Sequence, residues 1–358
     1  MNNYNEIRRK SKKIRVGNLY IGGDSPVTVQ SMTTARGYEG IYRQMKDLEA
    51  AGCDIVRMTV PDMENVRILA RLKESDLKMP IVADIHFDHR MAIESAAAGA
   101  DKVRINPGNI GSPDRVKAVV DACRKADIAI RVGVNSGSLE KSKLEEYGGV
   151  TPEALAQSAL GNVRLLEKYD FDNIVVAVKS SSPYKMAAAN RLIAAECPYP
   201  LHLGVTEAGT ERLGEIKGAA GIGGLLLSGI GDTLRVSLTA DPVKEVLCGR
   251  RILDALGFGG GMLELVSCPT CGRTMIDIIG IAEEFERRMQ TVRLTRPVKV
   301  AVMGCVVNGP GEASDADVGI AGGVGEAALF KKGKIVGKVP ENELVERLIS
   351  EVLAMQNE

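Results

Sequence analysis

Three cysteines in the last quarter of the sequence have a spacing that could support chemistry. Cys268 and Cys271 are separated by two residues in "VSCPTCGRT", and Cys305 completes the pattern Cys-x2-Cys-x33-Cys. A structural zinc site commonly uses two cysteine pairs, or a cysteine pair with a histidine pair. All three histidines precede residue 203, so this C-terminal segment offers no histidine pair. A thiol redox pair, in turn, needs no third cysteine.

The three cysteines best fit a [4Fe–4S] cluster whose fourth iron is held by a weaker ligand. Glu312 is the candidate for that ligand, because it follows Cys305 by seven residues in the glycine-rich segment "NGPGE". Zinc binding and thiol redox chemistry stay open as alternatives. The remaining cysteines have apolar or helical neighbours and are expected to be small, inert core residues; they are Cys53, Cys123, Cys197 and Cys248.

Eight short apolar runs alternate with helical patterns in the first two-thirds of the chain and predict an α/β fold. Nearly continuous apolar runs are typical of parallel strands buried on both faces. The alternation over this length predicts a (β/α)8 TIM barrel. A doubly wound open sheet is disfavoured because no G-x-G-x-x-G follows the first run. The predicted strands are 28–33, 54–60, 81–87, 102–108, 129–135, 173–180, 201–207 and 224–230.

A smaller C-terminal domain is expected after the barrel. The segment "LGFGGGM" (256–262) is glycine-rich enough for a linker, so the predicted domains are a substrate-binding barrel (1–255) and a cluster domain (263–358). The second domain reads as an α+β unit. After the Cys268–Cys271 pair, its predicted elements are a helix (275–290), two strands (299–305 and 317–323), a hairpin (327–339) and a terminal helix (341–356).

Five cations lie at the ends of predicted barrel strands, where the active site of a TIM barrel is found: Arg57, Arg104, Arg131, Lys179 and Arg235. Their mutual repulsion would be relieved by an anion, and the planar fork of arginine suits phosphate. We therefore expect a small molecule with more than one phosphate. Glu207 is a candidate for proton transfer. Further polar residues at these ends are Asp84, His86, Asn106, Asn135 and Ser237.

Composition argues against several other classes of protein. Lys+Arg and Asp+Glu are both 46, so the formal net charge is zero, which disfavours a general nucleic-acid binder. The polar N-terminal segment does not resemble a secretory signal. No run of about 18 apolar residues predicts a membrane span. We expect a cytoplasmic protein with reduced thiols. Residues 136–154 are expected to form either a lid over the site or a surface loop.

Four motifs resemble a known family over essentially the whole chain. They are "SCPTCGRT", "VMGCVVNGPGEASDADVGIAGG", "RVGVNSGSLE" and "RINPGN", and they are similar to motifs of the 4-hydroxy-3-methylbut-2-enyl diphosphate synthases. The resemblance implies a two-electron reductive ring opening and dehydration of 2-C-methyl-D-erythritol 2,4-cyclodiphosphate in isoprenoid biosynthesis. It also implies a [4Fe–4S] cofactor, flavodoxin or ferredoxin as electron donor, and a homodimer whose active site is shared between subunits.

The resemblance further implies roles for individual residues. The cluster ligands correspond to Cys268, Cys271, Cys305 and Glu312, and the barrel glutamate corresponds to Glu207. The substrate contacts correspond to Arg57, Arg104, Arg131, Asn135, Lys179, Arg235 and Ser237, with Asp84 and His86 beside them. The alternative for the barrel is a methyltransferase or a pterin-binding transferase that carries a structural zinc.

Overall fold

The computed structural model describes residues 4–259, 262–289, 292, 294–306 and 315–356. The chain divides into two compact units, Met1–Gly259 and Gly260–Glu358. The boundary between the units falls within the glycine-rich segment 256–262.

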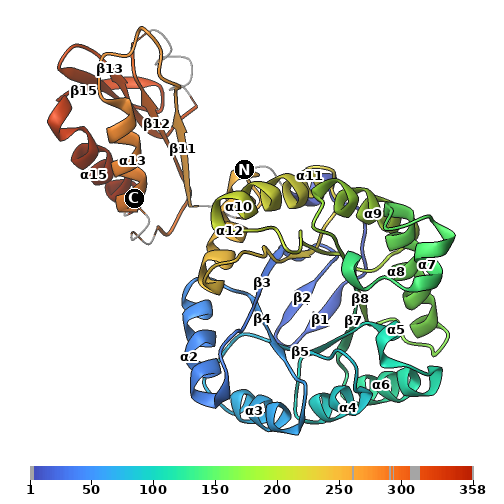
Figure 1. Ribbon diagram of the computed structural model, residues 1–358. Helices are drawn as coiled ribbons and strands as arrows, with labels where there is room; N and C mark the ends of the chain where they lie inside the picture. The colour runs from blue at the N-terminus through green and yellow to red at the C-terminus, as the bar shows by residue number, and fades with distance from the viewer. Residues whose placement is uncertain (1–3, 260–261, 290–291, 293, 307–314, 357–358) are drawn as a thin grey trace. The chain divides into compact units, whose positions relative to one another are not determined.

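The first unit is built on a parallel sheet that closes into a barrel (Figure 1). Its strands follow the order β8-β7-β6-β5-β4-β3-β10-β9. A parallel bridge between Val176 and Leu201 joins the two ends of the sheet, which confirms the predicted TIM barrel. The strands are β3 (Thr28–Met32), β4 (Ile55–Thr59), β5 (Ile81–Asp84), β6 (Lys102–Ile105), β7 (Ala129–Asn135), β8 (Ile174–Lys179), β9 (His202–Leu203) and β10 (Thr233–Leu234).

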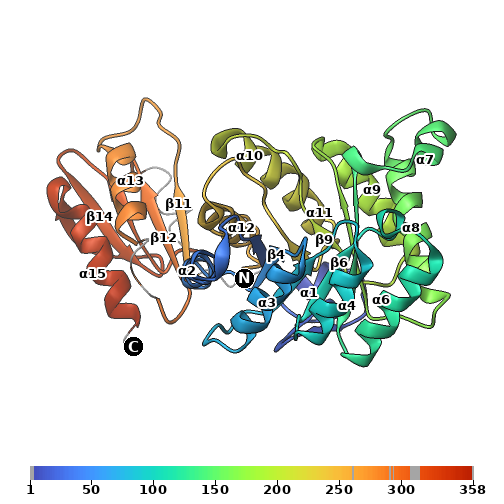
Figure 2. The same cartoon turned by 60° about the horizontal axis from the view of Figure 1, so that its bottom comes forward.

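Helices surround the strands, as the view in Figure 2 also shows. Several begin at a side-chain cap; Thr151, for example, accepts a hydrogen bond from the backbone N–H of Ala154. The helical segments are α2 (Gly37–Ala50), α3 (Met63–Lys73), α4 (His89–Ala97), α5 (Pro107–Ile110), α6 (Pro113–Lys125), η1 (Ser136–Ser138), α7 (Lys141–Glu146), α8 (Pro152–Glu167), α9 (Pro183–Glu196), α10 (Glu211–Gly218), η2 (Ala219–Gly223), α11 (Gly224–Leu226) and α12 (Pro242–Ala255).

The predicted eighth strand was wrong. The run 224–230 begins with the short helix α11, which continues α10 and the π-helical turn η2. The eighth strand is instead β10, which is only two residues long. A short apolar run looks the same in a buried helix as in a buried strand, and Leu225 and Leu226 are indeed fully buried. The other seven predicted strands overlap observed ones, although the runs 81–87, 102–108 and 201–207 extend past the ends of β5, β6 and β9.

An N-terminal hairpin, which the sequence patterns did not predict, covers one end of the barrel. Strands β1 (Ile14–Val16) and β2 (Leu19–Ile21) pair antiparallel after the short helix α1 (Tyr4–Ile7). Apolar side chains of the hairpin form a buried cluster with residues from the beginnings of the barrel strands; the cluster contains Ile14, Val16, Ile21, Ile55, Val82, Ala129 and Val175. The hairpin therefore closes the amino-terminal end of the barrel and leaves the carboxyl end for a site.

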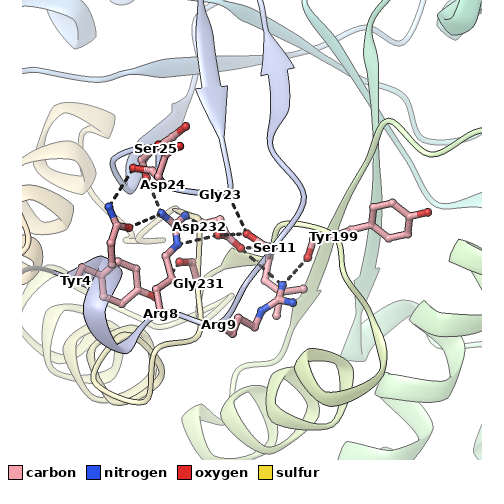
Figure 3. Close-up of polar contacts among 12 residues, drawn as sticks. Tyr4, Arg8, Arg9, Ser11, Gly23, Asp24, Ser25, Tyr199, Gly231 and Asp232 are labelled. Atoms are coloured by element: carbon pink, nitrogen blue, oxygen red, sulfur yellow. Dashed lines mark hydrogen bonds and ion pairs between the residues drawn. The ribbon is translucent and has the colours of Figure 1, made fainter.

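A buried ion pair fixes this N-terminal segment to the barrel (Figure 3). Arg8 Nε and Nη2 donate to Asp232 Oδ1 at 3.1 and 2.5 Å, and both side chains are almost completely buried. Asp232, just before β10, also accepts from Ser11 Oγ at 2.8 Å and from the backbone N–H of Leu201 at 2.7 Å. Because this one carboxylate joins the N-terminal segment to the residue that precedes β9, we expect it to stabilise the closed end of the barrel.

Replacing Arg8 by methionine is therefore expected to lower the free energy of unfolding by roughly 1.5–3 kcal/mol, the usual effect of losing hydrogen bonds to a buried charge. Urea unfolding at neutral pH measures this loss. Lys13→Met is the matched control, because the Lys13–Asp24 ion pair is exposed on both sides and should contribute little. Equal stability of the two variants would contradict an anchoring role for Arg8.

In its described residues, the second unit is a five-stranded sheet with two helices on one face (Figures 1 and 2). Strands β11, β12 and β13 are parallel, and β14 and β15 continue the sheet antiparallel. The elements are β11 (Leu263–Ser267), α13 (Ile278–Met289), β12 (Val298–Met303), β13 (Val318–Gly322), β14 (Glu326–Lys331), β15 (Lys334–Pro340), η3 (Glu341–Glu343) and α15 (Leu344–Gln356). This matches the predicted α+β pattern. In the described residues of both units, no helix is long and apolar enough for a membrane span.

Candidate active site

A polar cavity of about 150 Å³ opens at the carboxyl ends of the barrel strands. It brings together all five predicted cations and three of the predicted polar residues. The lining residues are Met32, Arg57, Asp84, His86, Arg104, Arg131, Gly133, Asn135, Ala177, Lys179, Thr206 and Arg235. Successive side chains of a strand point to opposite faces, and the cations occupy positions that face the barrel interior. Because the strands pair in parallel, these positions come together inside the barrel.

Asp84 is the one carboxylate among the described residues that line this cavity. Its Oδ1 lies 3.1 Å from Arg104 Nη1, and its Oδ2 lies 3.4 Å from Arg57 Nε. Burial alone would raise the pKa of Asp84, but attraction by Arg57 and Arg104 outweighs it and lowers the pKa to about 2. His86 Nε2 lies 3.9 Å from the same carboxylate. Asp84 therefore stays ionised and holds two of the arginines in place.

Glu245 plays the same part for Arg235, and the sequence patterns did not point to it. This buried residue of α12 accepts hydrogen bonds from Arg235 Nε and Nη2 at 3.1–3.2 Å. It also accepts from Ser31 Oγ at 3.1 Å and from the backbone N–H of Leu238 at 3.0 Å. Because the carboxylate is shared among three elements, the guanidinium of Arg235 is oriented at the cavity wall.

The remaining cations of the cavity, Arg131 and Lys179, are balanced by less negative charge. Arg131 is almost fully buried, and its Nη1 donates to Gln30 Oε1 at 3.3 Å. Burial lowers the pKa of Lys179 well below its ordinary value, and repulsion from Arg235 and Arg57 lowers it further. A Cβ atom on Gly204 would lie 2.9 Å from Lys179 Nζ, so the glycine makes room for this side chain. Burial of unbalanced positive charge costs free energy that an anion would recover.

Other predicted site residues do not line the cavity. Glu207 and Ser237 lie in the loops after β9 and β10; Glu207 is exposed and Ser237 is partly buried. Glu207 has a left-handed backbone conformation, with φ of 51°. The side chain of Asn106 accepts from the backbone N–H of Gly108 at 3.2 Å and caps α5. Glu312 lies outside the described residues.

Two of the three C-terminal cysteines lie at the ends of neighbouring strands. Cys268 directly follows β11, and Cys305 lies two residues after the end of β12, which pairs with β11 in parallel. The backbone N–H of Gly304 donates to Cys268 Sγ at 3.2 Å. Cys305 is buried, Cys268 is partly buried and Cys271 is exposed. A hydrogen bond from the backbone of Arg273 lowers the pKa of the Cys271 thiol.

The described residues do not contain three histidine, cysteine or acidic side chains grouped closely enough to hold a metal ion. Cys268 and Cys305 thus lie at the same end of the sheet. The other four cysteines are buried, as predicted, and burial raises the pKa values of Cys53 and Cys123 to about 12. They are consequently poor nucleophiles and poor ligands.

Comparison with known proteins assigns both units to one family. Residues 11–250 match the model of the GcpE TIM-barrel domain, and residues 264–354 match that of the GcpE protein C-terminal domain. The chain belongs to the GcpE family. This confirms the resemblance drawn from the sequence motifs. Because both units match, the alternative of a barrel methyltransferase or pterin-binding transferase with a structural zinc is not favoured.

Curated proteins that are similar to this chain include several named 4-hydroxy-3-methylbut-2-en-1-yl diphosphate synthase (flavodoxin). The protein of Ruminiclostridium cellulolyticum is 52% identical over 350 residues, which are 97% of this chain and 98% of the relative. That of Caldanaerobacter subterraneus is 53% identical over 355 residues, 99% of each chain. Among solved structures, type I 3-dehydroquinate dehydratase from Clostridium difficile is similar, with a TM-score of 0.51, 13% identity, and coverage of 69% of this chain and 98% of that one. At that identity, the likeness concerns the barrel fold alone.

Proposed function

We propose that the chain reduces 2-C-methyl-D-erythritol 2,4-cyclodiphosphate to 4-hydroxy-3-methylbut-2-enyl diphosphate, in line with the name of its relatives. The reaction consumes two electrons, breaks the bond between the tertiary carbon and a phosphate oxygen, and releases a neighbouring hydroxyl with a proton as water. The observation that carries the proposal is the cavity with five cations and a single lining carboxylate among the described residues. Such a charge excess suits a diphosphate.

The proposed substrate contacts are the cavity cations together with Asn135 and Ser237. Arg57 and Arg104 are oriented by Asp84 and would hold one phosphate, while Arg235 is oriented by Glu245. Because these guanidinium groups are held in place before the ligand binds, less conformational entropy is lost on binding. His86 borders the cavity and is proposed as a further contact.

Glu207 is proposed as the proton donor to the departing hydroxyl. The left-handed backbone of this non-glycine residue is uncommon, and such conformations concentrate at functional sites. Its position after β9 is at the same end of the barrel as the cavity. The Glu207→Gln variant keeps the size of the side chain but cannot donate the proton.

We propose a [4Fe–4S] cluster held by Cys268, Cys271, Cys305 and Glu312. The donor set fits because three thiols lie at or after the ends of two paired strands, with the Gly304 N–H already donating to one sulfur. Hydrogen bonds to sulfur are among the means by which a protein tunes such a cluster. When bound, the cluster would supply low-potential electrons and an iron that accepts an oxygen ligand.

The proposed electron donor is flavodoxin, which the relatives' name includes, with ferredoxin as the alternative. The proposed compartment is the cytoplasm, where these thiols would stay reduced. The proposed assembly is a homodimer in which the cluster domain of one subunit closes over the barrel of the other. The glycine-rich linker 256–262 would then be the hinge, and residues 136–154 a lid. Sedimentation analysis of the anaerobic protein, with and without substrate, tests the dimer.

The deciding experiment is an anaerobic assay of the full-length protein with the cyclodiphosphate and a dithionite-reduced mediator, with the product identified by mass. Formation of 4-hydroxy-3-methylbut-2-enyl diphosphate supports the proposal. A protein with one zinc, no acid-labile sulfide and no turnover would overturn it. Reduced flavodoxin and reduced ferredoxin are then compared as donors at equal concentration.

Replacing Arg131 by alanine is expected to weaken substrate binding by roughly 1.5–3 kcal/mol, because a buried phosphate would lose charged hydrogen bonds. The fold should tolerate the change, since it removes one of several mutually repelling cations. Calorimetry without reductant measures the affinity. The matched control is Arg164→Ala on the outer helix α8, where the side chain is exposed. Unchanged affinity of Arg131→Ala would place that residue outside the site.

A further inference from the structure

A lysine lies buried in the barrel beneath the cavity and has no part in the contacts proposed above. Lys102 begins β6, two residues before the cavity residue Arg104, so both side chains face the barrel interior. The alternate residues Val103 and Ile105 pack in the apolar core outside the strands. Lys102 is fully buried, and its Nζ has no hydrogen-bond partner among the described residues.

Polar atoms of other buried residues are similarly unpaired. Gln30 Nε2, Arg131 Nε and His202 Nε2 are buried without a partner in the described part of the chain. The other ring nitrogen of His202 lies 3.4 Å from Thr233 Oγ1. The interior beneath the cavity therefore holds several donors and a large excess of positive charge.

The charged groups around Lys102 decide its ionisation. Arg131 on β7 and Arg57 on β4 repel its ammonium form, and Asp101, adjacent in the chain, attracts it. Arg104 on the same strand and Asp84 on β5 form an ion pair at 3.1 Å, so their charges largely cancel. Burial, followed by repulsion from Arg131, lowers the pKa of Lys102 well below its ordinary value. His202 faces the same charges and is affected in the same direction.

Among these cations, lysine differs from arginine in one decisive respect. An arginine side chain does not lose its proton in proteins, whereas a buried lysine readily does. Without an anion, Lys102 can therefore relieve the repulsion by being neutral. A doubly charged diphosphate placed above it offsets most of this excess positive charge, so the ammonium form of Lys102 becomes less costly.

We propose that Lys102 takes up a proton from solvent when the cyclodiphosphate binds, so that the anion and the proton enter the barrel together. This inference rests on the proposed function. The amine gains one proton, no other bond changes, and the charge added by the ligand is partly balanced. By linkage, affinity then falls as pH rises, by up to about tenfold per pH unit for one proton.

The test is calorimetric titration of the full-length, anaerobically purified protein with the cyclodiphosphate. No reductant is added, so no turnover occurs. Each phosphorus of the cyclic ligand carries one strongly acidic oxygen, so the ligand itself does not titrate near neutral pH. Titrations in buffers of different ionisation enthalpy count the protons taken up. The wild type should take up protons, and Lys102→Met should take up fewer, by up to about one per site.

Two comparisons separate the possible outcomes. Lys179 could also gain a proton, so the decisive quantity is the difference in proton uptake between the wild type and Lys102→Met. The matched control is His202→Gln, which changes another buried residue near Lys102. Wild-type binding without proton uptake overturns the proposal even if the variants do not fold. Equal uptake by the wild type and a folded Lys102→Met also overturns it, as does a loss confined to His202→Gln. Absence of any binding would overturn the proposed function, and this inference with it.

Discussion

Replacing Cys305 by serine is expected to abolish synthase activity together with the iron content and visible absorbance of the anaerobically purified protein. Cys305 is buried just after β12, and the N–H of the preceding Gly304 contacts Cys268. Iron–sulfur clusters are held by cysteine thiolates, and a serine hydroxyl is a far poorer ligand at neutral pH. Iron and acid-labile sulfide assays, an absorbance spectrum and the anaerobic assay measure the effect.

The matched control is Cys248→Ala, because this cysteine is also buried but lies on α12 of the barrel unit. It should keep its iron and sulfide content. Full iron content in Cys305→Ser would mean that another residue supplies the third ligand. Loss of iron from both variants would point to a general effect on folding instead.

Replacing Asp84 by asparagine is expected to lower the free energy of unfolding by about 3–5 kcal/mol at neutral pH, the typical cost of leaving buried charges without their partner. The carboxylate lies within 3.4 Å of both Arg57 and Arg104. An amide of the same shape cannot balance either guanidinium. Urea unfolding measures the change, and substrate affinity is followed in the same samples.

The pH dependence of the wild type provides an independent check. The pKa of Asp84 is about 2 in the folded protein and about 3.9 in an unfolded chain. The stabilisation of the folded protein by ionised Asp84 is therefore fully present above about pH 4 and is lost as the pH falls towards 2. Asp84→Asn should lack this part of the acid dependence. Asp172→Asn, which removes an exposed ion pair with Lys12, should retain it; the same acid profile for Asp84→Asn and the wild type would contradict the assignment.

Several site residues could be predicted because strands have a simple period. Arg57, Arg104, Arg131 and Lys179 lie within or at the ends of strong apolar runs, and the structure places all of them on one cavity. The same alternation could have found Lys102, two residues before Arg104. Lys102 was not predicted because it lies at the start of β6, whereas the active site of a TIM barrel is expected at the carboxyl ends of the strands.

Glu245 could not be found in this way. It lies on α12, and helical periodicity alone does not tell a buried acidic residue from one on a solvated face. Its value to the site depends on contact with Arg235 and Ser31, which belong to other elements. The eighth strand was missed because the longer apolar run 224–230, which precedes β10, resembles a buried strand although it begins as a helix.

The sequence by itself determined the family, seven of the eight barrel strands, and the residues capable of the chemistry, because these depend on local patterns and long motifs. Only the tertiary structure decided which charges meet. Closure of the barrel by the bridge between Val176 and Leu201 brings β10 beside β3, and the N-terminal hairpin covers the opposite end. Ion pairing, burial and the ionisation of Lys102 all follow from these long-range contacts. Electrostatic energies depend on distance and solvent exposure in space, which spacing along the chain does not encode.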